Sequence, residues 1–575
     1  MAMVGFSGED RVSETQGLLI KGGTVVDGTG APSRLSDVRV IGRHIAEIGP
    51  DLAPDGESVI DASGAYVTPG WIESHTHFDG SMWWDPSCDP MPAHGTTTAV
   101  IGNCGLTVAP LSKSARASML ELFCFIEDLP LHAFTHAVPW DWESWPEYQR
   151  AINAHPAAIN TAVFVGHQAL RTHVMGEQAW ERAATSFEVD AMCVLLDDAL
   201  RHGGIGLSTT FMDTDRNNRE VPSRKADDSE FGRLLDVVAR HPGATLQFVP
   251  RFMQPEYWQD DFDRMATLCA PRGVKANWGA LRCEQQRADE FSERYSYNKA
   301  INARGAQVAP LFSHARSYVN LHFDRSIMWH GVLAWHELAN GPVADKERLL
   351  ADPAWRARAR AEWDACTYTL APIRTPERFI LDHSERELAG QTGMSLVEYA
   401  AQRNLHLSDA IATWLLDNGI ASSMRTAEWP LDEAAVCELI RDPLTVTGAS
   451  DAGAHIQMFS GAGNSTYLFT RYVRDAGLLS IEEAVHAVTG KHASFFGLND
   501  RGVLQVGKAA DVVVFALDEI EVGRDVRVDD VPGGSWRYTR PDAGYRATIA
   551  NGAPTYLDGK ATKARAGQMV GLTPA

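Results

Sequence analysis

The alternation of short apolar runs with amphipathic segments between about residues 67 and 450 constrains the fold most strongly. The runs are rich in β-branched residues, as buried strands are, whereas the segments at 192–200 and 229–238 repeat apolar residues at helical spacing. Eight strands are expected, at residues 69–77, 96–101, 159–165, 204–208, 245–249, 274–278, 307–312 and 444–449. This alternation predicts an α/β fold, a TIM (β/α)8 barrel.

Short strand signals also flank this region at both ends of the chain. They lie at residues 18–20, 24–26, 38–41 and 45–48 and again at 502–504, 510–515 and 547–552. Each group is too small to close a core alone, so residues 1–66 and 496–575 are predicted to form one small β-sandwich domain. The barrel then occupies residues 67–495. Its stretch at about 316–442 is too long for one crossover and predicts an inserted helical region over the barrel mouth.

Charge and cysteine content narrow the classes of partner. The 575 residues carry a formal net charge of −22 at pH 7, which disfavours nucleic acid and anionic membranes. No apolar run reaches the roughly 20 residues of a membrane span, and the first residues lack a signal-peptide pattern. Eight scattered cysteines without a CxxC pair are typical of reduced thiols. We therefore expect a cytoplasmic protein with a small-molecule substrate, and a homo-oligomer is compatible with these features.

Two histidines end the first expected strand, in the sequence PGWIESHTH at residues 69–77. Alternate residues of a strand point to one side, so His75 and His77 share a face and lie about 7 Å apart along the chain. Two imidazoles in this arrangement can bind one divalent metal, and the alternative is a hydrogen-bonded histidine pair. The Pro-Gly turn and the apolar run before them favour the metal.

The ends of the other barrel strands supply further candidates, because catalytic residues of such barrels lie at the C-terminal ends of the strands. The candidates are Cys104 after the second strand, His167 after the third, His314 after the seventh and Asp451 after the eighth. From the residues alone, Cys104 is equally well explained as a small buried hydrophobe. His167 and His314 are better explained as hydrogen-bonded mouth residues than as ligands, and either can hold a substrate carbonyl.

Asp451 is expected to act as the general acid and base of the reaction. A carboxylate beside a metal-bound water can accept its proton and pass it to the leaving group. The alternative is a helix cap, which Ser450 and Asp451 can also supply.

Substrate contacts are assigned to residues close to these strand ends. Arg171 can bind an anionic group, as can Arg251 and Arg316, and for each the alternative is a surface ion pair. Trp84, next to Trp83, can wall an apolar pocket, as can the stretch around Trp329 and Trp335; the alternative is a core role. The expected substrate-binding residues are His167, Arg171, His314 and Trp84.

Several motifs together carry a family resemblance. They are TPGWIESHTH at 68–77, HGTTT at 94–98, GNCG at 102–105, GHQALR at 166–171, GIGLST at 204–209 and SDAGAH at 450–455. Across them the chain resembles the amidohydrolase superfamily and, within it, the N-acyl-D-amino-acid deacylase (D-aminoacylase) family. The resemblance implies metal-dependent hydrolysis of the amide (C–N) bond of a small N-acylated substrate. It also implies His75, His77 and Asp451 as metal ligands, with Asp451 as acid/base, and Cys104 as a thiolate ligand.

One departure from the family pattern bears on the number of metals. Strand five ends at 248–251 and strand six at 277–282 without the histidines that complete a second metal position in the family. We therefore expect one Zn²⁺ per chain, with another divalent metal as the alternative. The rival function is a related metal-dependent hydrolase or lyase acting on a lactam, carbamate, ester or decarboxylation substrate. A non-catalytic relative is disfavoured, because the metal ligands are present.

Overall fold

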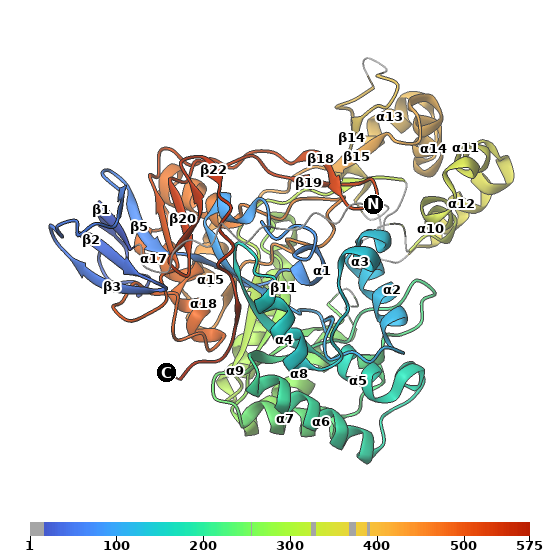
Figure 1. Cartoon of the computed structure of the whole chain (residues 1–575). Helices are drawn as coiled ribbons and strands as arrows, with labels where there is room; N and C mark the ends of the chain where they lie inside the picture. Colours follow the sequence, from blue (N-terminus) through green and yellow to red (C-terminus); the bar gives the residue numbers. More distant parts are fainter. Residues whose placement is uncertain are drawn as a thin grey trace, which may run out of the picture.

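The computed structural model of the protein describes residues 17–252, 254, 256–323, 329, 331–366, 375–387 and 391–574. A strand-rich part lies at one side, the barrel in the centre, and a helical part projects at the other side (Figure 1). None of the described helices combines the length and apolar character of a membrane span.

The central sheet consists of eight parallel strands hydrogen-bonded in chain order, and it confirms the predicted TIM barrel. The strands are β6 (Trp71–Glu73), β7 (Thr96–Ile101), β8 (Asn160–Gly166), β9 (Gly204–Thr210), β10 (Thr245–Val249), β11 (Lys275–Leu281), β12 (Val308–Phe312) and β16 (Val446–Thr447). The first and last strands meet where Ser74 Oγ donates to Thr447 O at 2.7 Å and Thr76 bridges Ala452. A short C-terminal strand, β23 (Met569–Val570), pairs with β8.

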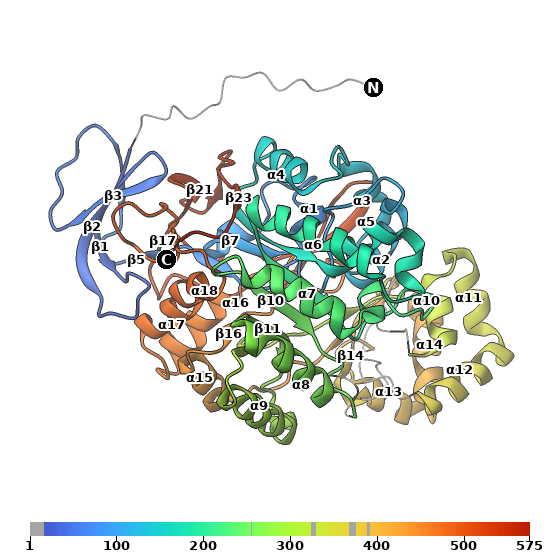
Figure 2. The same cartoon turned by 90° about the horizontal axis from the view of Figure 1, so that it is seen from below.

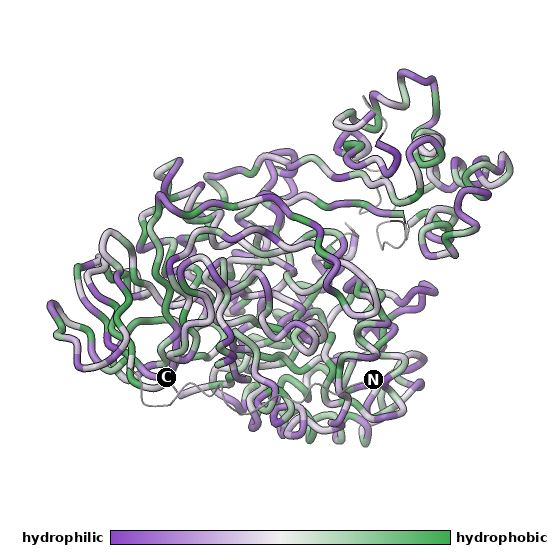
Figure 3. Tube along the Cα trace, turned by 45° about the horizontal axis from the view of Figure 1, so that its top comes forward, coloured by the Kyte–Doolittle hydropathy of each residue, from purple (hydrophilic) through white to green (hydrophobic). Residues whose placement is uncertain are grey.

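Helices surround the strands, as the view from below shows (Figure 2). They are α4 (Trp145–Ala154), α5 (His167–Met175), α6 (Ser186–Arg201), α7 (Asp228–Ala239), α8 (Trp258–Cys269), α9 (Ala288–Ala303), α15 (Glu433–Arg441), α17 (Ile481–Val488) and α18 (Gly490–Phe495). Among these helices, α6 and α7 contain the two segments, 192–200 and 229–238, that were predicted to be helical. A capping box of Thr185 and Glu188 begins α6. Apolar segments are frequent in the centre of the molecule (Figure 3).

The first barrel strand is shorter than expected. It ends at Glu73, so the expectation that His75 and His77 lie within the strand is wrong. They follow it in the segment where Thr76 N donates to Val100 O at 3.0 Å. At the other end of β6, Gly70 separates this strand from β5. A Cβ atom at Gly70 would collide with the Thr97 side chain.

Both ends of the chain contribute to one nine-stranded sheet. Its strands are β1 (Leu18–Val25), β2 (Arg34–Ile41), β3 (His44–Gly49), β4 (Ser58–Asp61), β5 (Tyr66–Pro69), β17 (Val512–Phe515), β20 (Ala547–Ala550), β21 (Ala553–Leu557) and β22 (Lys560–Ala561). β5 joins the two halves, parallel to β1 and antiparallel to β17. Residues 502–504, expected as a strand, lie outside regular strands.

The inserted region contains helices and a small sheet with its own apolar core. Its elements are β13 (Asn320–Leu321), α10 (Leu333–Asn340), α11 (Val343–Ala351), α12 (Pro353–Ala365), β14 (Phe379–His383), α13 (Leu396–Arg403), α14 (Leu407–Asn418) and β15 (Ser423–Thr426). Trp329 and Trp335 are fully buried in this core with ring centroids 5.1 Å apart. They stabilise the insert, so their assignment to a substrate pocket is wrong.

A hairpin that the sequence did not predict links the C-terminal part to the insert. It consists of β18 (Val526–Val531) and β19 (Ser535–Thr539). Tyr538 N donates to Ile456 O at 2.6 Å, and the Tyr538 hydroxyl lies 3.2 Å from His322 Nε2 of the insert. The hairpin thus contacts both the insert and the segment that follows Asp451 (Figure 1).

Candidate active site

The closure of the barrel brings Asp451 to the histidine pair. Asp451 N donates to His75 O at 3.2 Å, and His77 N donates to Ala452 O at 2.8 Å. As a result, Asp451 Oδ1 lies 3.4 Å from His75 Nε2 and 3.9 Å from His77 Nε2. The two imidazoles are buried, whereas 42% of the Asp451 side chain is exposed.

Cys104 reaches the same point from the turn after β7. Gly102 and Gly105 have φ values of +74° and +77°, and Cys104 itself has +57°. Cys104 N donates to Gln247 Oε1 of β10 at 2.8 Å, which fixes the turn, and its Sγ lies 3.4 Å from His75 Nε2. Among the described residues, His75, His77 and Cys104 form a group whose donor atoms all lie within 4.8 Å of one another.

Left-handed backbone conformations cluster around these side chains. Each costs on the order of 1–3 kcal/mol in a residue with a side chain and persists where the surrounding structure imposes it, often at functional sites. The residues are Cys104, Ala449 (φ +59°), Asp451 (+50°) and His455 (+49°). Their concentration at one end of the barrel supports an active site there.

The donor set fits a zinc ion. Tetrahedral zinc with ligands at about 2.0–2.3 Å requires donor atoms separated by roughly 3.3–3.8 Å. Three of the donor pairs here, Cys104–His75, Asp451–His75 and Asp451–His77, are separated by 3.4, 3.4 and 3.9 Å, close to that range. Burial lowers the pKa of His75 and of His77, which keeps both imidazoles neutral and able to bind a metal. Burial and neighbouring carboxyl groups raise the pKa of the Cys104 thiol, and a bound cation favours the thiolate form.

Glu127, which the sequence analysis missed, supports the pair from behind. It follows α2 (Arg116–Ile126) and is 3% exposed. Its Oε1 lies 3.4 Å from His77 Nδ1 and its Oε2 lies 3.8 Å from His455 Nε2. A carboxylate behind a metal-binding imidazole sets its tautomer and orientation. No sequence motif identifies this glutamate. It lies near the histidines because α2 packs against the barrel, and the sequence around Glu127 does not predict that packing.

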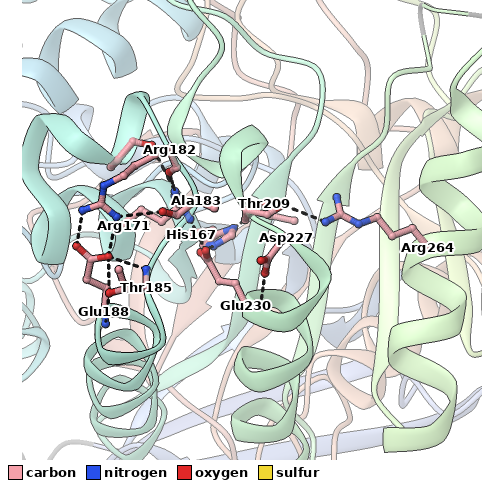
Figure 4. A network of polar contacts seen from close by, with 12 residues as sticks. His167, Arg171, Arg182, Ala183, Thr185, Glu188, Thr209, Asp227, Glu230 and Arg264 are labelled. Carbon is pink, nitrogen blue, oxygen red and sulfur yellow. Dashed lines mark hydrogen bonds and ion pairs between the residues drawn. The ribbon is translucent and has the colours of Figure 1, made fainter.

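His167 and Arg171 do not face the site. His167 Nε2 lies 2.7 Å from Glu230 Oε1 and its Nδ1 lies 3.1 Å from Thr209 Oγ1. Arg171 pairs with Glu230 and also donates to Arg182 O at 2.8 Å (Figure 4). Both side chains are fully buried between α5 and α7. The expectation that they bind substrate is therefore wrong, because both side chains are buried and Glu230, the Thr209 hydroxyl and backbone oxygens already occupy most of their polar atoms.

Replacing Arg171 by methionine is expected to destabilise the protein by about 3–5 kcal/mol, because Glu230 would keep a buried charge with only His167 as partner. Chemical denaturation measures this loss. The double variant Arg171→Met/Glu230→Gln should recover part of it. A stable Arg171→Met protein with a raised KM for carboxylate substrates would contradict the structural role.

His314 and Trp84 contact other protein groups and are not among the residues that line the pocket beside Asp451. His314 is 1% exposed, with Nε2 2.8 Å from Asn464 O, and burial lowers its pKa to about 4. Trp84 is half-buried and packs on Phe134 with ring centroids 6.3 Å apart. Neither lines the pocket beside Asp451. Their expected substrate contacts are therefore corrected to structural ones.

A pocket of about 270 Å³ opens beside Asp451. Its lining residues include Arg282 and Cys283, which follow β11, and Arg378 and Trp429, which belong to the insert. The pocket thus joins the metal-donor group to a surface that carries arginine side chains.

Comparisons with known proteins agree with this geometry. The amidohydrolase family profile matches residues 58–556. N-acyl-D-aspartate deacylase of Alcaligenes xylosoxydans xylosoxydans is 29% identical over 510 residues, which cover 86% of this chain and 85% of that protein. D-aminoacylase of the same organism is 27% identical over 574 residues, with 97% and 98% covered. A solved D-aminoacylase, described for its binuclear metal centre with one-metal activation and second-metal attenuation, has a TM-score of 0.64 at 25% identity, with 96% and 98% covered.

These relatives confirm the predicted class, a metal-dependent amidohydrolase that acts on non-peptide carbon–nitrogen bonds. The family profile spans most of the sequence, and the solved relative covers nearly all of the fold. The chain therefore belongs to the amidohydrolase family and is similar to the D-aminoacylases.

Proposed function

We propose that this protein hydrolyses the amide bond of N-acyl-D-amino acids at a single zinc held by His75, His77 and Asp451, with Cys104 beside it. The observation that carries the proposal is the convergence of these four side chains at the mouth of the barrel, next to a pocket. The activities of the deacylase relatives support the substrate class.

Each side chain has a distinct task in this reaction. The bound ion would polarise the scissile carbonyl and lower the pKa of water. Asp451, partly exposed at the pocket, accepts the proton of the attacking water and delivers it to the leaving amine. The buried histidines remain neutral donors, and Glu127 lies behind His77, with its Oε1 3.4 Å from His77 Nδ1.

The single metal follows from the side chains near Cys104. The last residues of β10 and β11 are Val249 and Leu281, which offer no donor atom. Deeper in the barrel, Gln247 and Asn277 are register partners on these strands, and both are buried neutral amides. An amide is a weak zinc ligand compared with the imidazole, thiolate and carboxylate groups of stable sites.

Elemental analysis together with a substrate panel tests the proposal. Protein purified without chelator should contain about one zinc per chain. It should hydrolyse N-acetyl-D-amino acids faster than their L-enantiomers and faster than lactams, carbamates or esters. A ratio near two metals would overturn the single-metal scheme, and no turnover of any N-acyl-D-amino acid by the metal-loaded protein would overturn the substrate class.

The proposed location is the cytoplasm. No disulfide joins the eight cysteines, all of which lie in the described part of the chain, and this agrees with a reducing compartment.

A further inference from the structure

The pocket beside Asp451 is formed by the barrel and the insert together. Arg282 follows β11 and Arg287 ends the short helix η5 (Gln285–Arg287). From the insert, Arg378 lies just before β14 and stacks on Trp429, with Cζ 3.9 Å from the ring centroid. Three guanidinium groups thus line a pocket that has Asp451 at its border.

The three arginines differ in how they are neutralised. Arg287 donates to Glu290 at 2.9 Å and lies 4.0 Å from Glu284. The guanidinium of Arg282 makes no hydrogen bond or ion pair with any residue that the structure describes, and its contact is the Phe252 ring at 5.8 Å. Arg378 donates to a backbone oxygen, Ala427 O, at 2.9 Å, and within the described residues it has no carboxylate at ion-pair distance.

Positively charged side chains outnumber negatively charged ones in the lining of the pocket. Glu284 and Asp451 line the pocket together with the three arginines, whereas the half-buried Glu290 is shared between Arg287 at 2.9 Å and Arg294 at 2.7 Å. The pocket lining therefore has three arginines and two carboxylates, and one of these carboxylates is the proposed metal donor Asp451. Glu293 and Glu377 are exposed to solvent. Burial and neighbouring guanidinium groups lower the pKa of Arg282 and Arg378. Partly buried cations without partners are costly, so two anionic groups of a ligand would stabilise this pocket.

We propose that the pocket selects substrates with two carboxylates, namely N-acyl derivatives of acidic D-amino acids. Arg282 follows a barrel strand, as the metal donors do, and binds the α-carboxylate next to the scissile amide. Arg378, on the insert, binds the side-chain carboxylate, held in place by Trp429. The inference rests on the proposed deacylase function and adds the side chain that the enzyme prefers.

Turnover by the metal-loaded enzyme tests the assignment. The wild type should have a kcat/KM for N-acetyl-D-glutamate and N-acetyl-D-aspartate at least about tenfold above that for N-acetyl-D-alanine. Arg282→Met should raise KM for all three by about 10–100-fold, the value of a lost charge-assisted hydrogen bond, with partial rescue in Arg282→Lys. Arg378→Met should lower kcat/KM much more for the two acidic substrates than for N-acetyl-D-alanine, so that the preference for acidic side chains disappears. Arg304→Met is the matched control, since Arg304 is exposed at the end of α9 and pairs with Asp263.

Calorimetric titration of the same proteins with glutarate and with acetate tests the dicarboxylate inference separately from the deacylase function. Glutarate should bind the wild type more tightly than acetate does, and both pocket variants should lose this difference. A wild type that prefers neutral side chains, or an Arg378→Met protein that loses both substrate types equally, would refute the dicarboxylate inference and leave the deacylase function standing. Arginine-dependent glutarate binding without any N-acyl-D-amino acid turnover would instead refute the deacylase function and leave only the dicarboxylate binding of the pocket standing.

Discussion

Replacement of Asp451 by asparagine is expected to lower kcat by about 10²–10⁴-fold with a much smaller change in KM. The amide preserves the shape of the side chain but cannot accept the proton of water or return it to the leaving amine. The short distances to His75 and His77 place this carboxylate at the metal-donor group, and its exposed edge borders the pocket. Steady-state kinetics on metal-loaded protein measure the effect.

Two controls make the result specific for proton transfer. The metal content of Asp451→Asn should be measured in the same samples, so that a lost proton shuttle is distinguished from a lost ion. Asp529→Asn, an exposed position in β18, should leave the kinetics unchanged. Unchanged kcat with a raised KM would show that Asp451 only binds substrate.

Replacement of His75 or His77 by alanine is expected to remove both the bound metal and the activity. Each histidine is one of the three proposed zinc ligands His75, His77 and Asp451, so its loss leaves only two of them. Metal content by elemental analysis and the rise of Tm on addition of zinc report binding independently of turnover. A fully active His75→Ala protein without metal would disprove the scheme.

If Glu127 orients His77, Glu127→Gln should weaken metal binding less than the histidine replacements do. Loss of such a carboxylate typically weakens metal affinity by about 10–100-fold, which competition with a chelator would measure. His136→Ala, at an exposed position of α3 (Leu131–Ala137), is the control and should behave as the wild type.

The amino-acid sequence determined those features that depend on neighbours along the chain. The bounds of β7 and β10 match the predicted strands, since continuous apolar runs between turns are typical of strands buried on both faces. Helices α6 and α7 were predicted from apolar spacing at 192–200 and 229–238, although the structure begins them at Ser186 and Asp228. The pair His75 and His77 was predicted from spacing, and Cys104 and Asp451 from the rule that the functional residues of such barrels follow the strands.

Only the tertiary structure decided which polar groups meet across long distances in the sequence. Arg171 and Arg282 both follow barrel strands, and no local pattern distinguishes them. Arg171 meets Glu230, which lies on a different helix, whereas Arg282 meets no described carboxylate and lines the pocket. Glu127 reaches His77 only through the packing of α2. Periodicity and caps determine where strands and helices begin and end, but the partner of a charged side chain depends on how whole elements pack, and packing depends on residues far apart in the sequence.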